Sequence, residues 1–146
     1  PRLSTSTKTN IWITPASGPF QRINVDTQIM DTVSFEFGTY IPQQTAWSSE
    51  TNGMAIGYEE GLGFSLFCLD TDVETATLAY ETAHYLTDVR QVGSKIWVSA
   101  RRSWLDTTAL GGLMIWDAET CTQETPNDWI RTQLDPVSIT WIPTQK

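Results

Sequence analysis

The chain has 146 residues, the size of one ordinary domain, and its hydrophobic content of 40% is too high for an intrinsically disordered polypeptide. Its formal charge of −8 has the wrong sign for a surface that neutralises nucleic-acid phosphates or anionic lipids. No apolar run approaches the ~18 residues that a bilayer-spanning segment needs. We therefore expect a folded domain with no nucleic-acid partner and no membrane insertion.

Composition and turn spacing predict a β protein. Thr is the commonest residue, at 22 of 146, and together with seven Trp, five Phe and four Tyr it favours pleated, half-buried surfaces over helices. Turn residues separate nearly all of the runs that are typical of strands. These runs are Ile11–Thr14, Phe20–Val25, Thr32–Phe37, Met54–Tyr58, Phe64–Leu69, Lys95–Ala100, Leu113–Asp117, Trp129–Leu134 and Val137–Ile142. They predict an all-β fold, an antiparallel β-sandwich or jelly roll with at most one or two short helices.

The chain begins with a polar segment. Pro1–Asn10 contains five Ser or Thr residues ahead of the first apolar run, and it is predicted to be a hinge or linker. No other linker is visible, so residues 11–146 are expected to form a single β-sandwich domain. Trp12 and Trp141 lie between apolar neighbours in the first and last strands of that domain, and we expect both in the core.

Trp47 has a more polar setting than these two. It lies in Pro42–Gly53, a stretch whose composition is typical of a surface loop. A large aromatic side chain in such a loop is a candidate contact for a ligand, so we place Trp47 in a predicted binding site. The alternative is that Trp47 packs within its own subunit.

The segment Thr71–Leu86 is ambiguous. Its first four residues fit a helix capping box, and apolar residues follow at helical spacing. Its four Thr residues argue against a helix, because β-branched side chains favour strands. The sequence therefore leaves a short helix and a strand both open here.

Arg101, Arg102 and Trp104 form the second part of the predicted binding site. Two of the nine positive charges in the chain lie there beside a planar aromatic ring. This combination is typical of contacts with a glycan, an acidic group or a partner chain. The alternative is that an arginine stacks on Trp104 within its own subunit.

The sequence contains no catalytic motif. His84 is the only histidine, and neither Cys68 nor Cys121 has the close ligand spacing of a zinc site. The acidic residues of Asp70–Glu74 lack the glycine of a calcium loop. We therefore expect no enzyme activity, no catalytic residue, no metal and no cofactor. The two cysteines can form one disulfide in a secreted protein or remain free thiols in one assembled inside a cell.

Three segments place Trp beside Ile or Val and so present apolar groups on both faces of a strand: Ile11–Ile13, Ile96–Val98 and Ile115–Trp116. A two-layer sandwich buries only one face of each strand. A tip loop, a short helix or another subunit must cover the second face. We expect a second subunit, and hence a homo-oligomer, because large uncovered apolar patches are rare on soluble monomers.

The arrangement along the chain resembles the protruding surface domain of a small icosahedral virus capsid protein, of the tombusvirus or nodavirus kind. The features that match are the Ser/Thr-rich segment Pro1–Asn10, the Thr-rich acidic β domain that follows, and the last predicted strand, Val137–Ile142, close to Lys146. The resemblance implies a β-sandwich on the virion surface that forms a dimeric or trimeric spike and attaches to a host glycan or receptor. It carries over no functional residue.

Two other classes of protein remain open. A secreted carbohydrate-binding module or lectin-like domain shares the β-sandwich, the excess of Trp and the acidity. A hydrolase is the third possibility, because Glu59–Glu60, Glu119 and Glu124 lie in or near predicted loops and could pair across a cleft.

Overall fold

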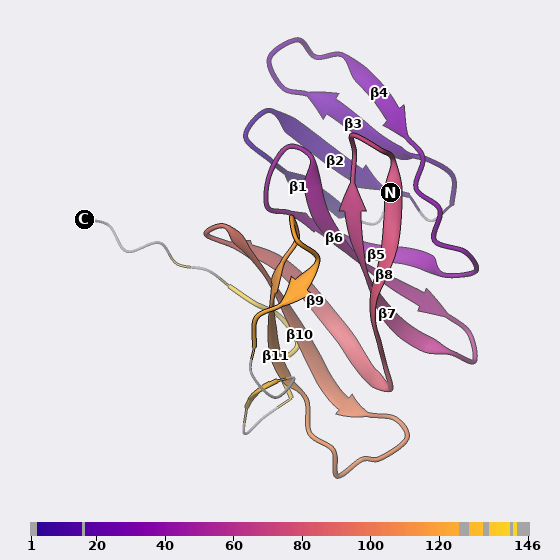
Figure 1. Cartoon of the computed structure of the whole chain (residues 1–146), viewed down its shortest axis with the longest axis vertical. Helices are drawn as coiled ribbons and strands as arrows, with labels where there is room; N and C mark the ends of the chain where they lie inside the picture. The colour runs from indigo at the N-terminus through magenta and orange to yellow at the C-terminus, as the bar shows by residue number, and fades with distance from the viewer. Residues whose placement is uncertain (1–2, 16, 126–128, 133–134, 141, 143–146) are drawn as a thin grey trace.

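The structure, a computed structural model, describes residues 3–15, 17–125, 129–132, 135–140 and 142. Over these residues the chain is all-β, with 13 strands in three antiparallel sheets and no helix (Figure 1). This confirms the predicted fold class, a sandwich-like antiparallel β architecture.

The three sheets follow one another along the chain. The N-terminal sheet contains β1 (Leu3–Ser6), β2 (Asn10–Thr14), β3 (Phe20–Asn24) and β4 (Met30–Val33) in that order. The middle sheet contains β5 (Ile41–Trp47), β6 (Asn52–Glu59), β7 (Gly63–Asp70) and β8 (Thr75–Thr82). The C-terminal sheet has the order β12 (Thr122–Gln123), β11 (Gly112–Asp117), β10 (Lys95–Ser103) and β9 (His84–Val92), and β13 (Ile130–Arg131) also pairs with β11.

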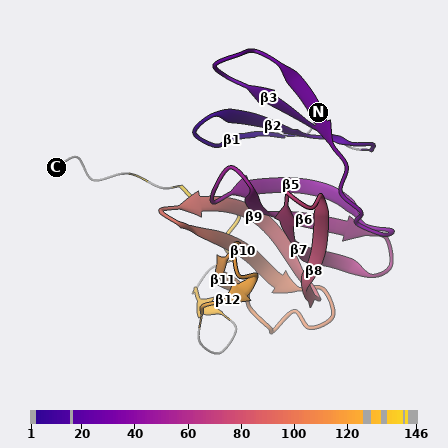
Figure 2. The same cartoon turned by 45° about the horizontal axis from the view of Figure 1, so that its top comes forward.

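The sheets form three layers, with the middle sheet between the other two (Figure 2). Side chains alternate between the two faces of a strand, so β6 supplies Ala55 to one core and Met54 and Ile56 to the other. The core against the N-terminal sheet contains Trp12, Phe20, Val33, Phe37, Trp47, Ala55, Phe67 and Leu69. The core against the C-terminal sheet contains residues such as Met54, Ile56, Leu66, Val89, Ile96, Val98, Met114 and Trp116. The third layer therefore covers the second face of the middle sheet, which a two-layer sandwich would leave open.

Several predicted elements are corrected by the structure. Leu3–Ser6 of the expected linker pairs with β2 as a strand at the edge of the sheet, where the β-branched Thr5 is favoured. For Thr71–Leu86, where the sequence leaves a helix and a strand both open, the structure has the strand: residues 71–74 form the turn between β7 and β8, and β-branched Thr residues continue into β8. Val137–Ile142 forms no strand in its described residues. Trp141 lies outside the described residues.

Other expectations hold in part. In the predicted run Thr32–Phe37, Val33 and Phe37 are buried while Thr32 and Ser34 are exposed, although the strand itself ends at Val33. In the predicted run Trp129–Leu134, only Ile130–Arg131 is assigned as a strand among the described residues.

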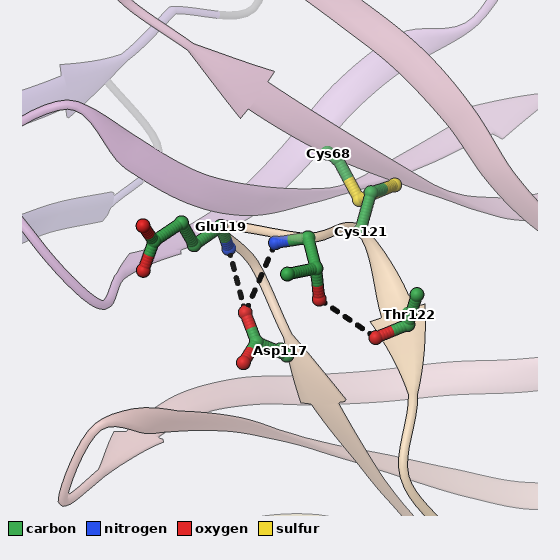
Figure 3. The surroundings of a disulfide bond; sticks show 6 residues. Cys68, Asp117, Glu119, Cys121 and Thr122 are labelled. Carbon is green, nitrogen blue, oxygen red and sulfur yellow. Dashed lines mark hydrogen bonds between the residues drawn. A yellow bond between two sulfur atoms is a disulfide. The ribbon is translucent and has the colours of Figure 1, made fainter.

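A disulfide joins the middle and C-terminal sheets (Figure 3). Cys68 lies on β7, and Cys121 lies in the turn after β11, where its φ is +54°. The Asp117 carboxylate holds this turn by accepting hydrogen bonds from the backbone N–H groups of Glu119 and Thr120, at 2.9 and 3.0 Å. The bond spans 53 residues of sequence, and a loop of that length restricts the unfolded chain by roughly 4 kcal/mol in the chain-entropy treatment.

A carboxylate attaches the N-terminal sheet to the middle sheet. Glu50, in the turn between β5 and β6, accepts hydrogen bonds from Thr7 Oγ1, Thr9 N and Asn10 Nδ2 in the β1–β2 turn, at 2.5, 3.0 and 2.7 Å. Burial alone would raise the pKa of Glu50, but these hydrogen bonds outweigh it and hold the pKa below its usual value. The ionised form is therefore the one that the fold stabilises.

Glu50→Gln is expected to lower the free energy of unfolding by roughly 1–2 kcal/mol at neutral pH. Because the folded-state pKa of Glu50 is depressed, its contribution is complete above the unfolded-state pKa and is lost as the pH falls through the folded value. Urea unfolding at pH 7 and at decreasing pH below 4 should show the difference between variant and parent shrinking. Glu60→Gln, at an exposed position, is the control. A Glu50→Gln effect that is the same at every pH would contradict this assignment.

Candidate functional site

The structure separates the two parts of the predicted binding site. Trp47 lies on β5, not in a loop, and is only 1% exposed. Its ring stacks on that of Trp12, with centroids 4.1 Å apart and planes 17° apart. The polar residues around Trp47 predict a surface loop, but Thr45, one of these residues, is itself buried. Its hydroxyl forms a hydrogen bond of 3.0 Å with that of Thr14, so the polar group has a partner inside the protein. Trp47 as an exposed ligand contact is therefore wrong.

Trp104 instead belongs to a group of four aromatic rings that we call the aromatic cradle: Tyr58, Phe64, Tyr85 and Trp104. Phe64 lies at the centre, with its ring centroid 5.0 Å from that of Tyr58, 5.9 Å from Tyr85 and 6.1 Å from Trp104. Tyr85 and Trp104 complete the group at 5.2 Å. The four rings come from β6, β7, β9 and the residue that follows β10, so the cradle lies where the middle and C-terminal sheets meet.

The cradle surrounds a small surface hollow of about 190 Å³. Its lining consists of the four rings together with Gly61 and Gly63 of the β6–β7 hairpin. Tyr58 is 36% and Tyr85 44% exposed, so two of the rings present accessible surface to a ligand. The neighbouring chain segments add exposed Leu62 and Leu105. The hollow is smaller than the ~300–1,000 Å³ of a pocket for a drug-sized molecule, and it suits a single ring or side chain.

Gly63 is the residue that allows Trp104 to lie against the hairpin. Its φ is +97°, a conformation that favours glycine, and a Cβ at this position would overlap the Trp104 ring. Gly61 also has a positive φ, +89°, but a Cβ there would meet nothing within 4 Å. Gly61 therefore occupies the hairpin turn, and Gly63, the first residue of β7, makes room for the cradle.

Gly63→Ala is expected to destabilise the protein more than Gly61→Ala. Each substitution places Cβ at a positive φ, which costs about 1–2 kcal/mol. Only the variant at Gly63 must also displace Trp104, and we expect this to add roughly 1–3 kcal/mol. Urea unfolding measures the two costs, and near-ultraviolet circular dichroism reports the altered Trp104 environment. Equal costs for the two variants would show that Trp104 does not pack on Gly63.

A β-bulge places Arg101 and Arg102 beside the cradle. The register between β10 and β9 pairs Ala100 with Leu86 and Ser103 with His84, so the two arginines together lie opposite Tyr85 alone. Ala100, Ser103 and Leu86 are buried, whereas Arg101, Arg102 and Tyr85 are exposed. The bulge therefore brings both arginines to the exposed side of the sheet next to a cradle ring.

Arg102 already has a carboxylate partner. Asp135 accepts hydrogen bonds from Arg102 N at 3.0 Å and from Arg102 Nε at 2.6 Å, and the guanidinium holds the pKa of Asp135 below its usual value. Asp135 begins a segment, Asp135–Ile139, that we call the strap. The strap is also fixed where Pro136 O accepts from Thr87 Oγ1 and where Ile139 N donates to a carboxylate oxygen of Asp88.

His84 and the two cysteines each have a structural partner. Both cysteines are in the disulfide. His84 Nδ1 lies 3.1 Å from the Thr82 hydroxyl, and its ring packs against Trp129 with centroids 5.0 Å apart. Within the described residues, no group of three or more His, Cys, Asp or Glu side chains could hold a metal ion. The arrangement at the cradle is suited to stacking and hydrogen bonding of a ligand.

Sequence reasoning found one ring of the cradle and missed three. The predicted residues Arg101, Arg102 and Trp104 lie in one segment, and of these only Trp104 lines the hollow; the sequence singles out none of Tyr58, Phe64 and Tyr85. The available signal was the Gly61-Leu-Gly63 hairpin with an aromatic residue on either side of it, since register partners in a hairpin lie on the same face. The contribution of Tyr85 depends on the packing of two sheets and leaves no local pattern.

Comparison of the sequence with protein-family models finds no match, and comparison with curated proteins finds none either. In the described part of the chain there is also no helix that could cross a membrane. The resemblance to capsid surface domains therefore stays a prediction from the sequence.

Proposed function

We propose that this domain is a non-enzymatic attachment domain that binds carbohydrate through the aromatic cradle, and that it serves as a surface spike domain of a viral capsid. The observation that carries the proposal is the cradle itself, with four rings around a hollow of about 190 Å³. Aromatic rings offer apolar faces to the C–H face of a sugar ring, while the Tyr hydroxyls and nearby arginines supply hydrogen bonds. The hollow suits one sugar unit of a surface glycan.

The disulfide favours a location outside the cytosol. Bonds such as Cys68–Cys121 persist in oxidising environments and are rare in cytosolic proteins. A virion surface fits this condition, and so does the alternative of a secreted carbohydrate-binding module. Both proteins would use the cradle in the same way, and they differ in whether the domain self-associates.

Trp104→Ala is expected to weaken binding to the best ligand on a glycan array by about 30-fold or more, the size of effect at a binding hot spot. Trp104 also packs on Phe64, so unfolding of the variant must be measured in parallel. Tyr85→Ala removes a more exposed ring and should weaken binding with little loss of stability. Leu78→Ala, at an exposed apolar position of β8, is the control. A parent protein that binds no glycan, or a Tyr85→Ala variant that binds normally, would refute the proposal.

A different surface supports self-association. Trp97 and Ile115 are register partners on β10 and β11, and both are half-buried. Ile96 and Val98 point into the core, so Trp97 lies on the opposite, outward face of the C-terminal sheet. Residues 1–83 contain ten acidic and three basic residues, whereas residues 84–146 contain seven and six. Two copies of this acidic chain can therefore meet at the C-terminal sheet with the least electrostatic repulsion.

Trp97→Ser is expected to shift a dimeric or trimeric parent toward the 16.4 kDa monomer in sedimentation at micromolar concentration. Ile29→Ser, at a 66% exposed position in the turn before β4, changes a comparable apolar side chain away from this face and should have no effect. A parent protein that sediments only as a monomer would count against the capsid spike and favour the carbohydrate-binding module.

A further inference from the structure

We infer that the sugar bound in the aromatic cradle carries a carboxylate group, and that Arg101 binds this carboxylate. The inference rests on the proposed carbohydrate-binding function and specifies its ligand class. It depends on three observations at the β10 bulge: the position of Arg101, its lack of a partner among the described residues, and the carboxylate already bound by its neighbour.

Arg101 lies opposite one ring of the cradle. The bulge places Arg101 and Arg102 opposite Tyr85 on the adjacent strand, and Tyr85 is in ring contact with both Phe64 and Trp104. A guanidinium on a long flexible side chain at this position can approach a group that projects from a ring held in the cradle. Its planar donors match the two oxygens of a carboxylate.

The Arg101 side chain is also available to bind a ligand anion. The other four cations on the C-terminal sheet have acceptors: Arg90 pairs with Asp88, Lys95 with Asp117 and Glu124, Arg102 with Asp135, and Arg131 with Leu110 O. The Arg101 side chain has no ion pair or hydrogen bond in the described part of the chain, and it is exposed. A ligand anion can pair with it without displacing a carboxylate of the protein.

A carboxylate of the protein already binds at the bulge, to the neighbouring Arg102. Asp135 accepts from both the backbone N and the Nε of Arg102, and it is the carboxylate of an extended segment lying against the sheet. The neighbouring arginine offers the same donor chemistry on the side of Tyr85 without a carboxylate from the described chain. For a protein with a charge of −8, an unpaired arginine beside an aromatic hollow is the position where an anion is favoured.

The test compares acidic and neutral forms of the same sugars by titration calorimetry or glycan array. The probes are oligosaccharides that end in N-acetylneuraminic acid or in glucuronic acid, and the same molecules with the carboxyl reduced to a hydroxymethyl group. We expect the parent protein to bind at least one acidic probe about tenfold or more tightly than its reduced form. Arg101→Gln should remove this difference, because it lowers the affinity for the acidic probe to that for the reduced form, and only the parent should lose affinity for the acidic probe as salt is raised.

Lys8→Gln is the matched control, because it makes the same change in net charge at an exposed position on the β1–β2 turn. It should leave both affinities unchanged. If the parent binds acidic and reduced probes equally well, and Tyr85→Ala binds neither, the inference is overturned. The carbohydrate-binding proposal would then remain intact. If the parent binds none of the probes nor any other glycan, the proposed function fails and the inference fails with it. If Lys8→Gln weakens binding of the acidic probes as much as Arg101→Gln does, the inference is also overturned, because binding would then depend on the overall charge of the protein.

Discussion

The middle sheet is apolar on both faces, and the rest of the structure follows from the need to cover them. Its strands bury side chains on alternate sides, with Ala55 in one core and Met54 and Ile56 in the other. One covering sheet would leave the second set in water, at a cost of about 25 cal/mol for each Å² of apolar surface. Two outer sheets remove both sets from water. Each is also held by a specific link to the middle sheet, through Glu50 on one side and Cys68–Cys121 on the other.

The same layering places the aromatic cradle. A site built from one sheet can use only the side chains of neighbouring strands on one face. Here the β6–β7 hairpin of the middle sheet and the end of β10 in the C-terminal sheet meet, so rings from both layers surround one hollow. The close approach of Trp104 to Gly63 depends on the absence of a side chain at that glycine. The cradle is therefore a property of how two sheets pack, and each ring also helps to hold that packing in place.

The sequence predicts most of the structure where burial and periodicity agree. Runs such as Phe64–Leu69 and Lys95–Ala100 contain the apolar residues of the cores, and both lie within strands. It fails where polar side chains are buried with partners. The Gln and Thr residues of β5 are typical of a loop, yet the Thr45 hydroxyl hydrogen-bonds that of Thr14 inside the interface, and Trp47 fills the interface. For the candidate site, the local segment 101–104 was identifiable, whereas Tyr58, Phe64 and Tyr85 become neighbours of Trp104 only through tertiary packing.

The disulfide also determines how the domain responds to a mechanical load. A pulling force applied at the two ends of the chain would travel to Cys68, cross the S–S bond and leave through Cys121. The segment between the two cysteines, which includes β8 to β11 and most of the C-terminal sheet, would bear none of it. At about 3.4 Å per residue, roughly 180 Å of chain is withheld from extension as long as the bond is oxidised. Tension would therefore act on the N-terminal sheet, on β5 and β6 and on the segment after Cys121, while β8 to β11 stay within a covalent ring.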